Sequence, residues 1–468
     1  MNREIGMEVQ QVDLGDERLN QRCRSLLETF AADPQASINA ACQGWAETQA
    51  AYRFFDNDKV TAGKVHQPHR EATLERIVQH PVVLIIQDTT ELDFTAHPPT
   101  GAGPLTSEDR LGFLDHTVLA ATPERLPLGV IEVDTYARSG EGFGESQKRR
   151  HNAIEEKETY RWLQGYRAAC EVTACVPGTK IVAVADREGD IYELFVEAQR
   201  HPTPAEYVIR AGKNRSLPKK DSDDDSDTYP KLRDAVAAAP LRTRLEVQLG
   251  QTPKRSARTA VVEVRALRVE LKAPYRQTGR LPNVTVSVVW VREVDPPEGV
   301  EPVDWLLFTS LPIERLEDVL RVVEYYAGRW TIEVFFRVLK SGCRVEEIQL
   351  ETEARLLPCL MLYRIVAWRV VYVTMLGREC PELSCTVLFT DPEWKSAYRI
   401  VRKVDPPVTA PSLKEFLFIL AELGGHNGRK HDAPPGPQAI WIGIRRMTDF
   451  AQAWLAFGPG SQTKPICV

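Results

Sequence analysis

The chain has 468 residues, of which 43% are hydrophobic and 26% are charged, with 28 glycines and 32 prolines. This balance is typical of a soluble globular protein of about two to four domains, and it excludes a fibrous, collagenous or wholly disordered chain. No stretch reaches the ~18 consecutive apolar residues that span a bilayer, and the first residues lack the apolar run of a signal peptide. We therefore expect a cytoplasmic protein without a membrane partner.

Nine scattered cysteines favour reduced thiols over a disulfide framework. The formal net charge of −6 argues, taken alone, against a nucleic-acid partner. Charge is concentrated, however, because ten basic residues stand against three acidic ones between positions 241 and 280, a local excess of +7. The basic residues of this block are Arg242, Arg244, Lys254, Arg255, Arg258, Arg265, Arg268, Lys272, Arg276 and Arg280. A focused basic surface on an acidic protein is the prediction.

Helical periodicity marks the first seventy residues. Apolar residues recur at three- and four-residue steps from Leu19 to Phe30 and again within residues 37–55. We expect a helical domain over residues 1–70.

The first predicted strand is the unbroken aliphatic run of residues 81–87, which has no solvent face and ends at Asp88. Further strands are expected over residues 115–120 and 128–133, after a loop rich in proline and glycine. The three strands should form a meander. His116, at the start of the second of them, is expected to be a core histidine rather than a ligand.

A β–α unit is expected next. A helix carrying Tyr160 precedes a second buried strand over residues 180–185, which ends at Asp186. A helix over residues 189–195 and a strand at residues 207–210 follow. Glu188 is compatible either with support of a metal site or with a helix cap.

The remaining chain divides into an insertion and helices. Residues 219–227 form a low-complexity acidic loop, expected to be a solvated surface rather than a metal site. The basic block then has apolar residues at every second position, which predicts an antiparallel β insertion at about 215–312. Helical periodicity returns at residues 316–340, and the residues after 358 are helical to the end.

The two strand-ending aspartates, Asp88 and Asp186, should lie close together at the carboxyl edge of one sheet, where open α/β folds bind ligands. A third carboxylate is offered by Glu333 in the helix predicted over residues 326–340. These three side chains are candidate ligands for a metal.

The same helix carries a polar stripe. At 100° per residue, Tyr326, Arg329, Glu333, Arg337 and Lys340 fall within an arc of about 80°, opposite an apolar side. From Arg329 to Lys340 the stripe spans about 16 Å, a length over which cations meet several successive DNA phosphates. A lone glutamate among cations suits a metal ligand held beside a polyanion.

These residues carry a resemblance. The spacing Y-x2-R-x3-E-x6-K of Tyr326, Arg329, Glu333 and Lys340 resembles the signature of the bacterial insertion-sequence-four family of cut-and-paste transposases, including its transposon-five-like members. The segments around Asp88 and Asp186 are similar to the two other acidic motifs of that family, in the same order. Residues 51–54 resemble part of its N-terminal DNA-binding helices, and residues 423–425 with Trp441 resemble its C-terminal region.

The resemblance implies an α/β fold in which an RNase H-like mixed-sheet catalytic core with an inserted antiparallel β region is flanked by N-terminal and C-terminal helical domains. The implied domains are DNA-end binding over 1–70, catalysis over 71–374 and dimerisation over 375–468. Asp88, Asp186 and Glu333 would be catalytic and would hold two Mg²⁺ ions per active site, with Mn²⁺ as a substitute.

The resemblance also implies DNA contacts. Trp305 lies where related transposases carry a tryptophan that stabilises DNA as a base is flipped out, although packing at a strand start is the alternative. The other implied contacts, for each of which an ordinary surface ion pair is the alternative, are Arg53, Arg210, Lys213, Tyr326, Arg329, Arg337 and Lys340.

The function implied is that of a DNA transposase. It would bind double-stranded transposon ends, cut them through a hairpin intermediate and join the 3′ ends to target DNA within a homodimer. Two alternatives stay open: a metal-dependent nuclease of the same fold without strand transfer, and an inactive DNA-end-binding inhibitor.

Overall fold

The structure is a computed structural model that describes residues 5–42, 44–107, 109–139, 154–219, 229–249, 257–275, 281–429 and 434–459. The acidic loop expected over residues 219–227 lies outside the described residues except for Lys219. Four cations of the basic block also lie outside them, namely Lys254, Arg255, Arg276 and Arg280.

The N-terminal region is helical, as its periodicity predicts. It comprises η1 (Gly6–Val9), α2 (Glu17–Ala32), α3 (Ile38–Cys42), α4 (Trp45–Phe55) and α5 (Ala62–Ile77). Two of these helices begin at side-chain caps, because Asp16 accepts a hydrogen bond from the backbone of Arg18 and Thr61 accepts one from that of Lys64. The apolar face of α2 is buried.

The described residues form one mixed sheet of ten strands, in the order β2-β3-β1-β5-β6-β10-β9-β8-β7, with β4 paired to β3. The first group of strands is β1 (Val82–Asp93), β2 (Gly103–Pro104), β3 (Leu111–Ala121) and β4 (Pro127–Tyr136). Strands β1, β3 and β4 pair antiparallel and form the predicted meander. His116 on β3 is 3% exposed, as expected of a core histidine.

A β–α unit follows the meander. It comprises η3 (Ile154–Glu156), α6 (Tyr160–Cys175), β5 (Lys180–Ala185), η4 (Arg187–Gly189), α7 (Tyr192–Arg200) and β6 (Glu206–Arg210). Strand β5 is parallel to both β1 and β6. Helix α6 of this unit packs on β1, β4 and β5, and β5 is buried except for its first residue.

The insertion extends this sheet rather than forming a separate one. After α8 (Leu232–Ala237), the strands β7 (Leu241–Leu249), β8 (Arg258–Leu271) and β9 (Val284–Glu293) are antiparallel. Strand β10 (Asp304–Thr309) joins β9 to β6. The antiparallel insertion is thus confirmed, and its strands continue the hydrogen-bond ladder of the core.

The helix expected over residues 326–340 is divided in three. Helix α9 (Leu316–Gly328) ends before Arg329, α10 (Trp330–Arg337) follows, and η5 (Val338–Gly342) is a turn of π-helix. Gly328 allows the end of α9 to approach β1 closely, because a Cβ there would lie 2.7 Å from Leu84 Cδ1. The short 3-10 helix η6 (Val345–Glu347) comes next.

The C-terminal part is helical. It contains α11 (Glu353–Glu379), η7 (Cys385–Val387), α12 (Asp391–Arg402), α13 (Leu413–Leu423) and α14 (Pro437–Phe457). Among the described helices, α11 alone is long and apolar enough to cross a membrane by length and composition, yet 89% of its apolar stretch is buried inside the fold. It is a core helix that packs on α2, α5 and β4.

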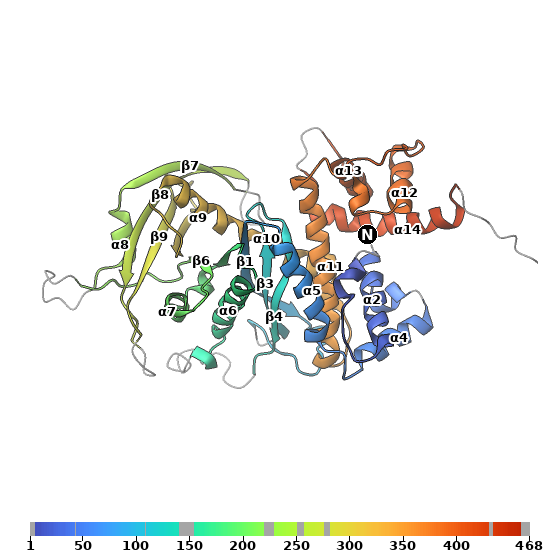
Figure 1. Cartoon of the computed structure of the whole chain (residues 1–468), viewed down its shortest axis with the longest axis horizontal. Coiled ribbons are helices and arrows are strands. Elements are labelled where there is room, and N and C mark those ends of the chain that lie inside the picture. Colours follow the sequence, from blue (N-terminus) through green and yellow to red (C-terminus); the bar gives the residue numbers. More distant parts are fainter. Residues whose placement is uncertain are drawn as a thin grey trace, which may run out of the picture.

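The two ends of the molecule differ in content. Figure 1 shows the insertion strands β7, β8 and β9 at one end, and the N-terminal helices together with α12, α13 and α14 at the other. Helix α11 runs between the sheet and this helical end. The mixed sheet with helices at both ends agrees with the fold expected from the sequence. Helix α10 lies beside β1 near the middle of the molecule.

Candidate active site

Asp88 and Asp186 lie at equivalent positions of two neighbouring parallel strands. The parallel register pairs Ile86 with Val184, so both aspartates lie two residues beyond the last register pair. Asp88 does not end its strand, as the apolar run suggested, because β1 continues to Asp93 on its antiparallel side. The two carboxylates nevertheless meet where the parallel pairing stops.

Backbone amides orient both carboxylates. Asp88 Oδ1 accepts a hydrogen bond of 2.8 Å from the backbone N–H of Thr89, and Asp186 Oδ1 accepts one of 2.8 Å from that of Glu188. Asp186 thereby caps η4. One oxygen of each aspartate is thus engaged by the backbone.

Arg329 bridges two of the three predicted acidic residues. Its Nη1 lies 2.6 Å from Asp88 Oδ2, and its Nη2 lies 3.2 Å from Glu333 Oε1. The side chains of Arg329 and Asp88 are only 13% and 14% exposed, whereas that of Glu333 is 39% exposed. The sequence stripe therefore contains an internal ion pair in addition to a row of cations.

Electrostatic interactions link Asp88 to the two other carboxylates. Burial raises the pKa of Asp88 to about 7, against the lowering effect of Arg329, and the charges of Asp186 and Glu333 raise it further. Because such interactions weaken with distance and with solvent screening, Asp186 and Glu333 lie in the neighbourhood of Asp88. The assignment of the three carboxylates to one metal site stays a prediction.

Within the described ranges, no three His, Cys, Asp or Glu side chains are grouped as a formed metal site. The donor set nevertheless fits a hard divalent cation, because it consists of carboxylate oxygens that repel one another around a buried aspartate. Asp88, Asp186 and Glu333 are the residues that would hold such a cation.

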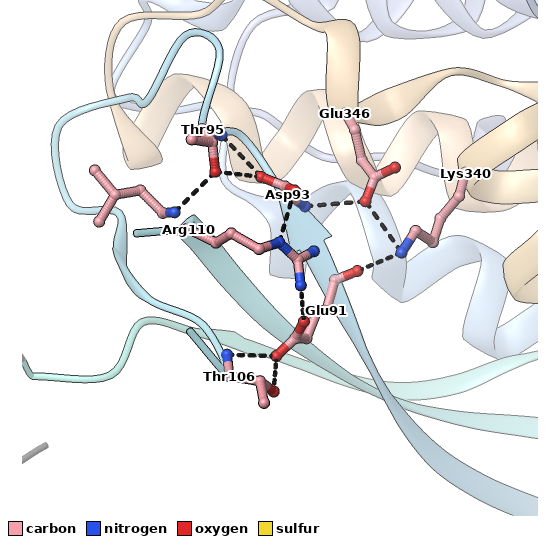
Figure 2. Close-up of polar contacts among 8 residues, drawn as sticks. Glu91, Asp93, Thr95, Thr106, Arg110, Lys340 and Glu346 are labelled. Carbon is pink, nitrogen blue, oxygen red and sulfur yellow. Dashed lines mark hydrogen bonds and ion pairs between the residues drawn. The ribbon is translucent and has the colours of Figure 1, made fainter. Parts of the chain in front are cut away.

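Lys340 is held at the edge of the site by two acceptors, as Figure 2 shows. Its Nζ donates to the backbone oxygen of Glu91 at 2.7 Å and lies 3.0 Å from Glu346 Oε1. The same Glu346 oxygen accepts the backbone N–H of Asp93 at 2.9 Å. Glu346, which our sequence reasoning missed, thus ties Lys340 and the end of β1 together.

Arg110 fastens the loop after β1. Its Nη1 lies 3.0 Å from Glu91 Oε2, and its Nε lies 3.0 Å from Asp93 Oδ2. The backbone N–H of Thr106 donates to Glu91, and that of Thr95 donates to Asp93. Acidic side chains that alternate along the exposed end of β1 are the signal that could have revealed this cluster. These contacts link the end of β1 to the loop that follows it, beside Lys340.

The predicted aromatic contacts pack on each other. The rings of Trp305 on β10 and Tyr326 on α9 are 5.3 Å apart at 63°, and Tyr326 is only 5% exposed. Trp330, which our sequence reasoning did not single out, is 49% exposed between Arg329 and the rest of α10. Its place at about 40° on the helical wheel, about 20° beyond the edge of the polar stripe, was an available signal.

The cations predicted to contact DNA differ in whether they already form hydrogen bonds within the protein. Arg210 donates to the backbone oxygen of Asp304 at 3.0 Å, and Arg53 on α4 lies at 3.5 Å from Gln49 Oε1. Arg337 and Lys213 are exposed. The assignment of each as a DNA contact stays a prediction.

Several arginines of the basic block are already paired. Arg244 lies 2.8 Å from Glu263, Arg265 lies 3.4 Å from the same carboxylate, and Arg258 pairs with Glu293. The local excess of +7 already counts Glu263, whereas Glu293 lies outside positions 241–280, so its pairing with Arg258 lowers the free positive charge of the insertion further.

Three family models match the chain. The model described as "Transposase DNA-binding" matches residues 5–60, "Transposase DDE domain" matches residues 109–367, and "Transposase Tn5 dimerisation domain" matches residues 365–456. The second alone covers more than half of the chain and includes Asp186 and Glu333, while Asp88 precedes it.

Among solved structures, the synaptic complex of piggyBac transposase with hairpin DNA is similar over 94% of this chain and 73% of that chain, at 8% identity and a TM-score of 0.37. The family matches follow the order of helical, mixed-sheet and helical parts seen in the structure. From these matches, the chain belongs to the insertion-sequence-four family of Tn5-like DDE transposases and is a DNA transposase with an RNase H-like core.

Proposed function

We propose that the protein binds the ends of a transposon, cleaves them by metal-dependent hydrolysis and a hairpin intermediate, and joins the freed 3′ ends to target DNA. The observation that carries this proposal is the cluster of Asp88, Asp186 and Glu333 beside the cations of α10 and η5. DDE transposases use divalent metal ions, and we assign Mg²⁺, replaceable by Mn²⁺, to these carboxylates.

The chemistry needs no nucleophilic side chain. Asp88, Asp186 and Glu333 would hold the divalent cations, which would supply activation of the attacking water or 3′-hydroxyl and stabilisation of the leaving oxygen. The residues of this chain supply the positions: the amides of Thr89 and Glu188 orient Asp88 and Asp186 through one oxygen each, and the second oxygens would serve as ligands of a cation.

The cations orient the DNA. Arg337 and Lys340 lie on the side of the helix that carries Glu333, and each would neutralise a phosphate near the cleavage site. Arg210 and Lys213, after β6, would extend this path, and Arg53 would contact DNA from the N-terminal domain. The side chain of Glu346 and the backbone oxygen of Glu91 hold Lys340 Nζ in place, which reduces the entropy that Lys340 loses when it binds a phosphate.

The matches support a proposed division of the chain into three domains. We assign end binding to residues 1–70, catalysis to 71–374 with the insertion at about 215–312, and dimerisation to 375–468. The DNA-binding and dimerisation models support DNA as partner and association of two copies. A homodimer on DNA would place one active site at each transposon end.

One experiment separates this proposal from its alternatives. The protein is incubated with Mg²⁺ and duplex DNA that carries the sequence bordering its coding region, and the products are resolved by size. Joined strands support transposition, cut ends alone indicate a nuclease, and a mobility shift without cleavage indicates an inactive end-binding protein.

A further inference from the structure

Arg329 holds the two oxygens that a cation would need. Asp88 Oδ1 is engaged by the amide of Thr89, so Oδ2 is the oxygen left for a ligand, and Arg329 Nη1 lies 2.6 Å from it. Arg329 Nη2 lies 3.2 Å from Glu333 Oε1. A guanidinium and a divalent cation at this place would use the same lone pairs.

The position of Arg329 suits a side chain that moves. Its backbone lies at the joint between α9 and α10, and the hydrogen bonds recorded for its guanidinium among the described residues go to the two carboxylates. A displaced guanidinium requires a new anion, because a partly buried charge without a partner is costly. A DNA phosphate beside Glu333 would be that anion, and its geometry matches two guanidinium N–H donors.

We infer that Arg329 couples DNA binding to cation binding, by competing with the divalent cation for Asp88 and Glu333 until a DNA phosphate draws its guanidinium away. This inference rests on the proposed function of the three carboxylates. The coupling is reciprocal: DNA strengthens cation binding by the same factor by which the cation strengthens DNA binding. Metal-dependent cleavage is thereby restricted to the DNA-bound protein.

The test is a binding measurement that requires no turnover. Mn²⁺ is titrated into the full-length protein by calorimetry, without DNA and with saturating duplex that carries the bordering sequence. For the unaltered protein, DNA should lower the Kd for Mn²⁺ by about 5- to 150-fold, the usual range of such coupling.

Three variants at position 329 isolate the bridge. Without DNA, Arg329→Ala and Arg329→Gln should bind Mn²⁺ more tightly than the unaltered protein by about the same 5- to 150-fold, and added DNA should then change the affinity little. Arg329→Lys keeps the charge but has a single nitrogen, so its affinity should be intermediate.

The matched control is Arg321→Ala, which removes an arginine of α9 that lies 3.2 Å from Asp318 and has no assigned role in the site. It should bind Mn²⁺ without DNA as the unaltered protein does. Equal gains for Arg321→Ala and Arg329→Ala would overturn the inference, because they would show a general charge effect. An unchanged DNA-free Kd in both neutral variants at position 329 would overturn it too.

Failure of the proposed function has a different signature. Asp88→Asn and Glu333→Gln should weaken Mn²⁺ binding at least tenfold, whatever the residue at position 329. If both bind Mn²⁺ normally, the carboxylates are not the metal site and the proposal and the inference fall together. If both lose Mn²⁺ while the variants at position 329 match the unaltered protein, the inference alone fails.

Discussion

Two arginine–aspartate pairs join the same sheet to consecutive helices, and they differ in what surrounds them. Asp115 on β3 pairs with Arg364 of α11, and their side chains are 0% and 1% exposed. Thr135 donates to Asp115 Oδ1 at 2.7 Å and Thr117 donates to Oδ2 at 3.1 Å. Both oxygens of this buried carboxylate therefore have neutral donors as well as the guanidinium.

In the pair of Asp88 with Arg329, the backbone N–H of Thr89 donates to Asp88 Oδ1, and the guanidinium alone is recorded as a donor to Oδ2 among the described residues. The two side chains are 14% and 13% exposed, and the charges of Asp186 and Glu333 act on Asp88. A buried charge pair is stable when hydrogen bonds satisfy the remaining lone pairs of its carboxylate. When other carboxylates lie beside it instead, a cation or an anionic ligand separates the pair more easily. The comparison indicates that the pair of Asp115 with Arg364 stabilises the fold, whereas the pair of Asp88 with Arg329 exchanges its partners for ligands.

The largest effect is expected from removing the metal ligands. Asp88→Asn, Asp186→Asn and Glu333→Gln should each reduce cleavage about 10³-fold or more, because several kcal/mol of transition-state stabilisation are lost. End binding should persist, since no phosphate contact is removed. Product gels and mobility shifts measure the two quantities, and a variant that cleaves normally is not part of the site.

Breaking the structural pair should cost stability instead. Arg364→Ala leaves Asp115 buried without its cation and should lower the free energy of unfolding by about 3–5 kcal/mol. Arg329→Ala should lower it by less than about 1 kcal/mol, because Asp88, whose pKa is raised to about 7, can take up a proton when the guanidinium is removed. Urea titrations of both variants compare them, and equal losses would contradict the distinction drawn between the pairs.

Asp88 should also impose a pH dependence on the metal-free protein. Its pKa is raised from 3.8 to about 7, so its contribution to stability is complete below pH 3.8 and is lost as the pH rises toward 7. The loss is on the order of a few kcal/mol. Asp88→Asn should flatten this part of the profile of unfolding temperature between pH 4 and 8, and an unaltered slope would remove Asp88 as its source.

The two tryptophans beside the site extend the comparison to base stacking. Trp305→Ala should leave the first nick normal but slow hairpin closure about 5- to 150-fold, because ~1–3 kcal/mol of stacking is lost. Trp330→Ala is the matched variant, since its indole is exposed whereas that of Trp305 packs on Tyr326. Nicked DNA that accumulates only in Trp330→Ala would transfer the stacking role to that residue.

The smallest effects concern phosphate contacts. Arg337→Ala and Lys340→Ala should each reduce the slope of log K against log salt for DNA binding by about 0.9, with sequence preference unchanged. Arg244→Ala should change it less, since Arg244 already pairs with Glu263. Equal changes in all three would show that paired arginines of the insertion also release counterions.

Local sequence determined the parts of this protein that depend on periodicity and spacing. The aliphatic runs before Asp88 and Asp186 predict buried neighbouring strands, and the spacing around Glu333 places it on a polar helix face. The alternating pattern of the insertion likewise predicts antiparallel strands. These features follow from side-chain direction along a strand or helix, which neighbouring residues decide.

Tertiary structure alone decided which charges are paired. That Arg329 lies between Asp88 and Glu333, that Glu346 holds Lys340 and that Glu263 holds Arg244 depends on segments far apart in the sequence. The break before α10 and the π-helical turn after it also arise where the chain packs closely on β1 and α11. Periodicity reports the face on which a charge lies, whereas its partner is set by the packing of another element against that face.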